Sequence, residues 1–121
     1  MNWDSVRYFS AREFTCSCCG EERMQEAFVR KLDQVRHELG RPIHITSGYR
    51  CPAYNAKISS TGRTGPHTTG LAADLALKGE IARDALVLLC DYFEGIGINQ
   101  KGEWEQRFIH VDDLDPRLWT Y

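Results

Sequence analysis

The sequence predicts an α+β domain in which a small, mostly antiparallel sheet packs with helices. Two stretches, residues 24–39 and 80–93, carry apolar residues at helical spacing. Several short stretches rich in alternating or β-branched residues lie between and after them, and the last two are joined by a polar loop, as in a hairpin. The chain has 121 residues and no repeat or linker-like segment, so we expect a single domain over residues 1–121.

The first predicted elements are helical. Ser10 is followed three residues later by Glu13, which is the capping-box pattern that begins a helical turn. From Met24 to Leu39 apolar residues recur at 24, 28, 32, 35 and 39, the stripe of a helix that faces a core. Gly40 follows at the position where a left-handed residue commonly ends a helix.

The middle of the chain predicts two strands separated by loops. Residues 43–47 alternate and are β-branched, so we expect a strand there, followed by a loop over 47–52. Residues 59–65 contain Ser, Thr and two Gly, which indicates an exposed, mobile loop. Residues 71–77 predict a second strand in which Asp74 shares its face with two alanines. That arrangement leaves space beside the carboxylate.

The last third predicts a helix and a hairpin. Residues 80–93 carry the stripe of ordinary core packing. Residues 95–99 and 108–112 read as two strands, joined across the polar loop 100–106. His110 and Asp112 lie two residues apart, so their side chains project to the same side of the last strand.

Charge and hydropathy argue against some classes of protein. Fifteen Lys and Arg stand against 17 Asp and Glu, for a formal net charge of −2, and no window concentrates basic residues as a nucleic-acid interface does. The first five residues lack the basic start and apolar stretch of a secretory signal, and the longest apolar run, 85–90, is too short to cross a bilayer. We therefore expect no export signal, no membrane insertion and no nucleic-acid partner.

The cysteines are five, an odd number, and three lie between 16 and 19. A fully paired disulfide framework is therefore excluded. Cys16 and Cys19 form a C-x-x-C, but a zinc knuckle needs further ligands, and Cys51 and Cys90 stand alone in the sequence. We favour small, partly buried side chains in a tight turn closed by Gly20. A redox or structural zinc protein built on Cys16 and Cys19 is a weaker alternative.

Three residues, His67, Asp74 and His110, form the pattern that best indicates chemistry. His67 precedes Asp74 by seven residues, and His110 occurs in the Phe-Ile-His-Val-Asp stretch. Two imidazoles and one carboxylate, with a fourth position left open, are a ligand set of hydrolytic zinc. Zinc lowers the pKa of bound water and polarises a carbonyl group, so no activated side-chain nucleophile is required. The chain has no Gly-x-Ser-x-Gly turn to supply one.

Taken together, several motifs resemble one known family. Ser47-Gly-Tyr-Arg50, His67-x-x-Gly70-x-Ala72-x-Asp74 and His110-Val-Asp112 occur in the order found in the zinc D-alanyl-D-alanine carboxypeptidases. That family includes phage L-alanyl-D-glutamate endolysins and is akin in structure to the hedgehog signalling domain. The resemblance extends from about Phe9 to Trp119 and includes the Phe14-x-Cys-x-Cys-Cys-Gly20 opening. It implies a hedgehog/DD-peptidase-like fold and zinc bound by His67, Asp74 and His110.

The resemblance also implies roles for residues near the zinc. Arg50 matches an arginine that would hold a substrate carboxylate or stabilise an oxyanion, although a structural ion pair is the alternative. Tyr49 would line the substrate pocket or, as an alternative, anchor the loop. Many members carry Ser two residues before the first His ligand, where this chain has Gly65. A hydrogen bond from that Ser would have to come from another residue.

The general acid/base is where the chain departs from the family. Some members place an acid three residues before the last ligand, but this position is Arg107, which cannot accept a proton. Others use the position five residues before it, which is Glu105. We therefore expect Glu105 to be the general acid/base, with Glu103 and Asp112 in reserve. A solvated loop charge is the alternative for the glutamates, and Asp112 is also placed to orient a ligand imidazole.

The function that the resemblance implies is hydrolysis of peptidoglycan stem peptides by a zinc metallopeptidase that acts as a monomer. The bond cleaved would be D-Ala-D-Ala, L-Ala-D-Glu or a cross-bridge. The lack of an export signal fits a phage or prophage product that is cytoplasmic until release, or virion-associated, and acts on the cell wall. The alternative is a catalytically inactive zinc-containing module that binds the wall, as the missing acid at position 107 suggests.

Overall fold

The computed structural model describes residues 1–121 and confirms the α+β class. Its helices are α1 (Glu26–Leu39), α2 (Pro52–Ile58) and α3 (Gly79–Tyr92). Its strands are β1 (Ile45–Ser47), β2 (Ala72–Leu75), β3 (Gly95–Asn99), β4 (Phe108–Asp112) and β5 (Arg117–Thr120). Five short 3-10 turns complete the chain: η1 (Trp3–Ser5), η2 (Ala11–Phe14), η3 (Gly62–Thr64), η4 (Pro66–Thr69) and η5 (Trp104–Gln106).

The five strands form one sheet in the order β1-β2-β4-β3-β5. Every neighbouring pair is antiparallel except β3 and β5, which are parallel. The hairpin expected from residues 95–99 and 108–112 is present with these bounds. In β4, the central strand, His110 lies opposite Asp74 of β2 on one side and Gly97 of β3 on the other.

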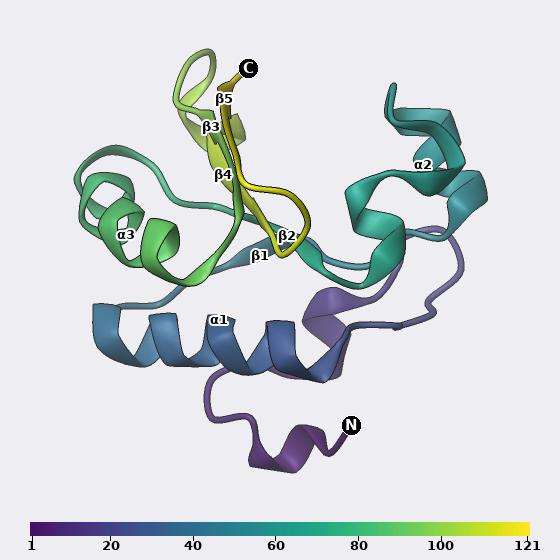
Figure 1. Ribbon diagram of the computed structural model, residues 1–121, viewed down its shortest axis with the longest axis horizontal. Coiled ribbons are helices and arrows are strands. Elements are labelled where there is room, and N and C mark those ends of the chain that lie inside the picture. Colours follow the sequence, from purple (N-terminus) through teal and green to yellow (C-terminus); the bar gives the residue numbers. More distant parts are fainter.

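One face of the sheet carries the hydrophobic core. Helices α1 and α3 pack against each other and against this face (Figure 1). Phe28 and Leu32 of α1 and Leu89 of α3 are fully buried there, against Leu75 and Ile109 from the strands. The helical stripes read from the sequence therefore face the sheet, as helical periodicity predicts.

The opposite face of the sheet is covered differently. Because side chains alternate along a strand, Asp74, His110 and Asp112 point away from the α1–α3 layer. Helix α2 and the turns η3 and η4 form a separate group at the right of Figure 1, and η4 contacts β2. This second face holds the polar residues that the sequence singles out.

Two glycines of β3 make room on that second face. A Cβ at Gly95 would overlap the carboxylate of Asp112, and a Cβ at Gly97 would lie 2.5 Å from the ring of Trp119. Real Cβ atoms do not approach neighbours so closely, so neither position accepts a side chain without displacing its neighbour. The Gly-Ile-Gly-Ile sequence of β3 thus places isoleucines on the core face and leaves the other face open.

The structure differs from the sequence predictions at several elements, and the predicted strands 43–47 and 71–77 are shorter, as β1 and β2. Helix α1 begins at Glu26 rather than at Met24. Helix α2 was not expected; Pro52 begins it, and Cys51 Sγ accepts a hydrogen bond from Tyr54 N, so the start is capped although no apolar stripe marks the helix. Strand β5 was also missed. It pairs with β3, far away in sequence, through the parallel ladder.

The segment 59–65, predicted to be a mobile loop, is held by specific contacts. It contains the turn η3. The buried Asn55 donates from Nδ2 to Thr61 Oγ1 at 2.8 Å and to the Gly62 carbonyl at 2.6 Å. A Cβ at Gly65 would overlap the Thr61 side chain. Thr61 and Asn55 therefore occupy the space that a serine side chain would need at position 65.

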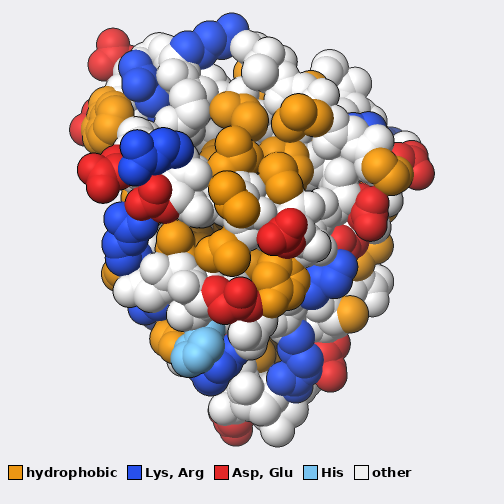
Figure 2. Space-filling view, turned by 60° about the vertical axis from the view of Figure 1, so that its left-hand side comes forward, with side chains coloured by type: hydrophobic (Ala, Val, Ile, Leu, Met, Phe, Trp, Pro, Cys, Tyr) orange, Lys and Arg blue, Asp and Glu red, His pale blue; other side chains and the backbone are white.

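The surface includes one apolar area. The α3 side of the molecule comes forward in Figure 2, where apolar side chains gather near the centre of the view. The most exposed large apolar residues of the chain are Leu118 of β5 and Val87 of α3, at 71% and 68%. None of the helices has the length and apolar character needed to span a membrane.

Candidate metal centre

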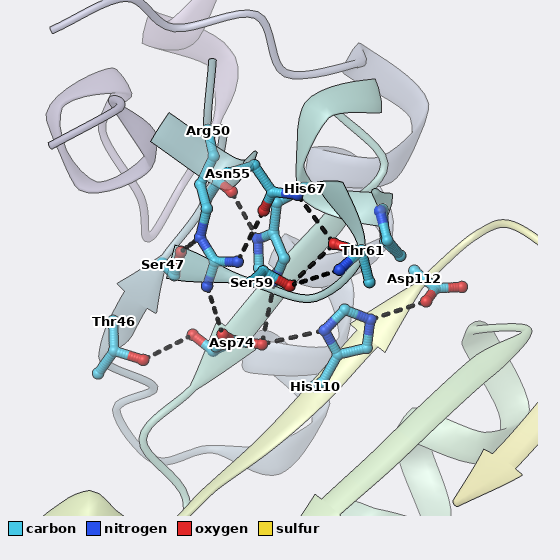
Figure 3. A network of polar contacts seen from close by, with 12 residues as sticks. Thr46, Ser47, Arg50, Asn55, Ser59, Thr61, His67, Asp74, His110 and Asp112 are labelled. Atoms are coloured by element: carbon cyan, nitrogen blue, oxygen red, sulfur yellow. Dashed lines mark hydrogen bonds and ion pairs between the residues drawn. The ribbon is translucent and has the colours of Figure 1, made fainter. Parts of the chain in front are cut away.

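His67, Asp74 and His110 converge on the second face of the sheet (Figure 3). Each offers one ligand atom, and these atoms all lie within 4.8 Å of one another. Asp74 Oδ1 is 3.3 Å from His67 Nε2 and 3.0 Å from His110 Nδ1. The structure therefore brings together all three residues that the sequence proposed as metal ligands.

Local structure explains why these side chains meet. Asp74 and His110 are directly opposed on β2 and β4, so their side chains leave the sheet side by side. His67 approaches from η4, which begins at Pro66 and is followed by Gly70. Gly70 has φ +77°, and a Cβ there would overlap the carbonyl of Arg23. Only glycine fits that position without strain.

The hydrogen bonds of the two imidazoles fix where their lone pairs point. His67 Nδ1 is 2.8 Å from the Gly48 carbonyl oxygen, and His110 Nε2 is 2.7 Å from Asp112 Oδ2. Both partners are acceptors, so these nitrogens carry the protons in the neutral rings. The remaining nitrogens, His67 Nε2 and His110 Nδ1, then present lone pairs to the Asp74 carboxylate. The lone pairs of these two nitrogens and of the carboxylate therefore face one another. Such a group of atoms can serve as the ligands of a divalent cation.

The titratable groups at this centre shift one another's pKa values. Burial raises the pKa of Asp74, but hydrogen bonds with His110 and His67 outweigh burial and hold it below its ordinary value. Burial lowers the pKa of His110, but hydrogen bonds to Asp112 and Asp74 outweigh it and raise that pKa. The lowered pKa keeps Asp74 ionised, which suits a metal-binding carboxylate. The raised pKa of His110 favours the protonated ring, so a metal ion that binds Nδ1 would release a proton.

Asp112 lies behind His110 rather than in the cavity. Its side chain is fully buried; Oδ2 accepts from His110 Nε2 at 2.7 Å and from Arg117 Nη2 at 2.6 Å, and Oδ1 accepts from Leu114 N at 3.1 Å. Burial raises the pKa of Asp112, but His110, the Leu114 amide and Arg117 together lower it. With both oxygens engaged, Asp112 orients the His110 ring and does not face a substrate.

Arg50 is held rigidly beside Asp74. Its Nε donates to Ser47 Oγ and its Nη1 to Asn55 Oδ1, both at 3.0 Å, while Nη2 is 3.4 Å from Asp74 Oδ2 (Figure 3). The Arg50 backbone N–H also donates to the carbonyl of His67 at 3.1 Å. Asn55, fully buried, was not singled out in the sequence. The one feature of the sequence that could have indicated Asn55 is that it lies in the first turn of a helix that begins at Pro52.

A cavity of about 450 Å³ opens over this centre. Arg50, His67, Asp74 and His110 line it together with residues from the 58–61 segment and from the C-terminal stretch. The Trp119 ring packs against the His110 ring at a tilt of 50°, with centroids 5.2 Å apart, and the Tyr121 ring lies 6.2 Å from that of Trp119. These aromatic walls were missed in the sequence. The signal was the aromatic, alternating run at 117–121 that follows Pro116.

Other expected residues lie elsewhere. Tyr49 is 5% exposed, belongs to the hydrophobic core and does not line the cavity. Glu103 and Glu105 are exposed at and within η5, and neither lines the cavity. Arg107 donates from Nε and Nη2 to the Gly102 carbonyl, which stabilises the same loop.

The fold and this centre define a class of protein: an α+β domain with a His–Asp–His cluster on the open face of its sheet, beneath a cavity. The family model described as Peptidase M15 matches residues 7–112. The chain therefore belongs to the Peptidase M15 family, the zinc metallopeptidases that include D-Ala-D-Ala carboxypeptidases and endolysins. A comparison with curated proteins finds no match. Strand β5, with Trp119, lies beyond the matched residues.

Proposed function

We propose that this protein is a zinc-dependent peptidase that hydrolyses peptide bonds in the stem peptides of bacterial peptidoglycan. Two findings support the proposal: membership of the Peptidase M15 family and the convergence of three acceptor atoms from His67, Asp74 and His110. The second finding is the one that carries it. When bound, the ion would act as a Lewis acid on the scissile carbonyl and lower the pKa of water.

Arg50 supplies the positive charge that would bind the substrate. A guanidinium has five N–H donors, and Ser47, Asn55 and Asp74 each engage one. The donors that remain are fixed in direction and lie in the wall of the cavity. They suit the carboxylate of a stem peptide or the oxyanion that develops during hydrolysis. Because the three contacts hold Arg50 in advance, little order is lost when the substrate binds.

The aromatic residues of the C-terminal stretch shape the substrate side of the cavity. Trp119 packs between His110 and Tyr121, and Phe108 and Tyr121 are also in contact, with centroids 5.1 Å apart. Such a wall excludes water from one side of the reacting bond and provides a surface for the short aliphatic side chains of a stem peptide.

The group that moves the proton is a separate proposal. Glu105 is the carboxylate that the sequence favours, and it lies on η5, in the loop between β3 and β4. Because Glu105 is exposed and does not line the cavity, this role requires η5 to approach the cavity when substrate binds. Geometries of this kind do tighten in the complex with substrate.

A second function is favoured by one specific observation. The only carboxylate among the residues that line the cavity is Asp74, which we assign to the metal. If no acid reaches the reacting bond, the protein is a zinc-containing module that binds peptidoglycan without hydrolysing it. The two functions share the metal, the cavity and Arg50, and they differ only in turnover.

The test is incubation of the purified, zinc-loaded protein with bacterial sacculi. We expect new amino termini or released D-Ala, and the identity of the product tells an endopeptidase from a carboxypeptidase. His110→Ala, which removes one metal ligand, should abolish the product. If the protein sediments with the sacculi but no product forms, the peptidase function is refuted and the binding module is the function supported. If the zinc-loaded protein neither binds sacculi nor releases product, both functions are refuted.

Glu105 is tested by comparing Glu105→Gln with Glu103→Gln at equal zinc occupancy. Both substitutions remove one exposed carboxylate from the same loop, so Glu103→Gln is a matched control. We expect turnover to fall by roughly 10²–10⁴-fold in Glu105→Gln alone, the usual contribution of general acid/base catalysis. Undiminished turnover in Glu105→Gln would exclude this residue.

A further inference from the structure

A second group of metal-binding side chains lies at the start of the chain. The Sγ atoms of Cys16, Cys19 and Cys51 are all within 4.8 Å of one another. Cys51, which stands alone in the sequence, is brought to the Cys16–Cys19 turn by the fold. Cys18, which precedes Cys19 in the chain, is exposed and is not one of these three mutually close thiols. None of these cysteines forms a disulfide.

Backbone hydrogen bonds build the turn that gathers these thiols. Cys16 N donates to the Glu21 carbonyl and Gly20 N donates to the Cys16 carbonyl, both at 2.8 Å. Gly20 has φ +75°, so the chain reverses at a position that suits glycine. On the other side, Tyr49 N donates to the Phe14 carbonyl at 2.9 Å, which aligns the segment before Cys16 with the loop before Cys51.

The surroundings of the thiols suit metal-bound sulfur. Cys51 N donates to Cys16 Sγ, and Tyr54 N donates to Cys51 Sγ, each at 3.4 Å. Backbone N–H groups directed at sulfur stabilise a thiolate, which is the form that binds metal. A tetrahedral zinc with Zn–S bonds of about 2.3 Å separates its sulfurs by roughly 3.8 Å. The observed cluster needs only a small contraction to reach that geometry.

We propose that Cys16, Cys19 and Cys51 bind a second zinc ion, and that the exposed Cys18 turns its side chain toward them to become the fourth ligand. Four thiolates leave no open position, so this site is structural rather than catalytic. It is independent of the proposed peptidase function, because none of its ligands belongs to the His–Asp–His centre. Binding releases the thiol protons and joins two segments that are more than thirty residues apart in the chain.

The location of Cys51 gives this second site a consequence for the first. Cys51 directly follows Arg50 and lies in the loop whose Gly48 carbonyl accepts from His67 Nδ1. An ion at the thiols would tie that loop to the N-terminal segment. The second zinc would therefore hold the Arg50 guanidinium and the His67 ring in place without touching the substrate.

The experiment counts metal and identifies its ligands in the reduced full-length protein. Zinc is measured by elemental analysis, and cobalt is substituted to detect the near-ultraviolet thiolate-to-cobalt absorption, which His and carboxylate ligands do not produce. We expect two zinc ions per chain in the wild type, one in Cys51→Ser and one in His110→Ala. The absorption should persist in His110→Ala and disappear in Cys51→Ser. Cys90→Ser, which changes an exposed cysteine outside the cluster, should match the wild type in both readouts.

Several outcomes would overturn this proposal. The reduced wild type could show no thiolate-to-cobalt absorption, or the absorption could survive in Cys51→Ser. A disulfide among these cysteines in protein purified without oxygen would also refute the site. If Cys51→Ser does not fold, an organomercurial titration of the wild type replaces it. Mercurial should release one zinc per chain, and no release would refute the site. Absorption without peptidase activity would uphold this site while refuting the proposed function.

Discussion

Replacing Asp112 by Asn tests how the metal centre is held. The carboxylate accepts three hydrogen bonds, two at Oδ2 from His110 and Arg117 and one at Oδ1 from the Leu114 N–H. Asparagine keeps the shape but has a single acceptor oxygen. If its oxygen replaces Oδ2, its amide opposes the Leu114 N–H. If it is turned round, the amide opposes the His110 Nε2–H and favours the wrong tautomer of the ring.

The magnitude follows from these contacts. Leaving one buried donor without a partner costs about 1–3 kcal/mol of folding stability, and Asp112 is fully buried. Loss of a carboxylate that orients a histidine ligand lowers metal affinity by roughly 10–100-fold, which corresponds to about 1.4–2.8 kcal/mol. We therefore expect Asp112→Asn to bind zinc more weakly and to unfold at a lower temperature.

The assay is a titration in zinc buffers that records bound zinc per chain. The binding step that is absent from His110→Ala belongs to the His–Asp–His centre, and Asp112→Asn should shift that step alone. Asp113→Asn is the matched control, because this neighbouring carboxylate bonds Lys31 and not His110. A shift in Asp112→Asn smaller than about threefold, or an equal shift in Asp113→Asn, would refute the role given to Asp112.

Three further predictions concern the cavity and the metal. Gly97→Ala would press a Cβ against the Trp119 ring. We therefore expect the free energy of unfolding, measured by thermal denaturation, to fall by about 1–3 kcal/mol and KM to rise. An unchanged stability together with an unchanged KM would contradict this packing. Arg50→Lys cannot reach its three partners together, so kcat/KM against sacculi should fall by roughly 10²-fold; kinetics like those of the wild type would argue against this function. A chelator should lower the melting temperature, and zinc but not magnesium should restore it. The melting temperature is measured by scanning calorimetry, and a value that does not change when chelator is added would rule out bound zinc.

The parts of the fold that the sequence predicted are those with long or regular patterns. The helical stripe before Gly40 and the hairpin over 95–112 are set by periodicity, and the structure confirms both. Helix α2 has seven residues and its buried residue is the polar Asn55, so hydrophobic periodicity could not reveal it. Strand β5 is an exposed edge strand whose partner is distant in sequence, and no local pattern specifies such pairing.

The candidate site was predictable to a similar extent. His67, Asp74 and His110 were found because each belongs to a short motif, and the structure brings them together. Side chains in loops were harder, because a loop residue's direction depends on contacts formed only in the folded chain. Tyr49 lies in the core, although its neighbour Arg50 lines the cavity. The gathering of Cys51 with Cys16 depends on the same long-range packing.

The division of the sheet into two faces gives this domain room to diversify. The α1–α3 layer supplies the buried apolar surface, and the cavity uses the alternate side chains of the same strands. Randomised libraries at Ser60 and Trp119 would alter the wall of the cavity while leaving the α1–α3 core and the Asn55–Thr61 hydrogen bond in place. A stabilised scaffold, improved only on its helical side, would then tolerate more of those variants.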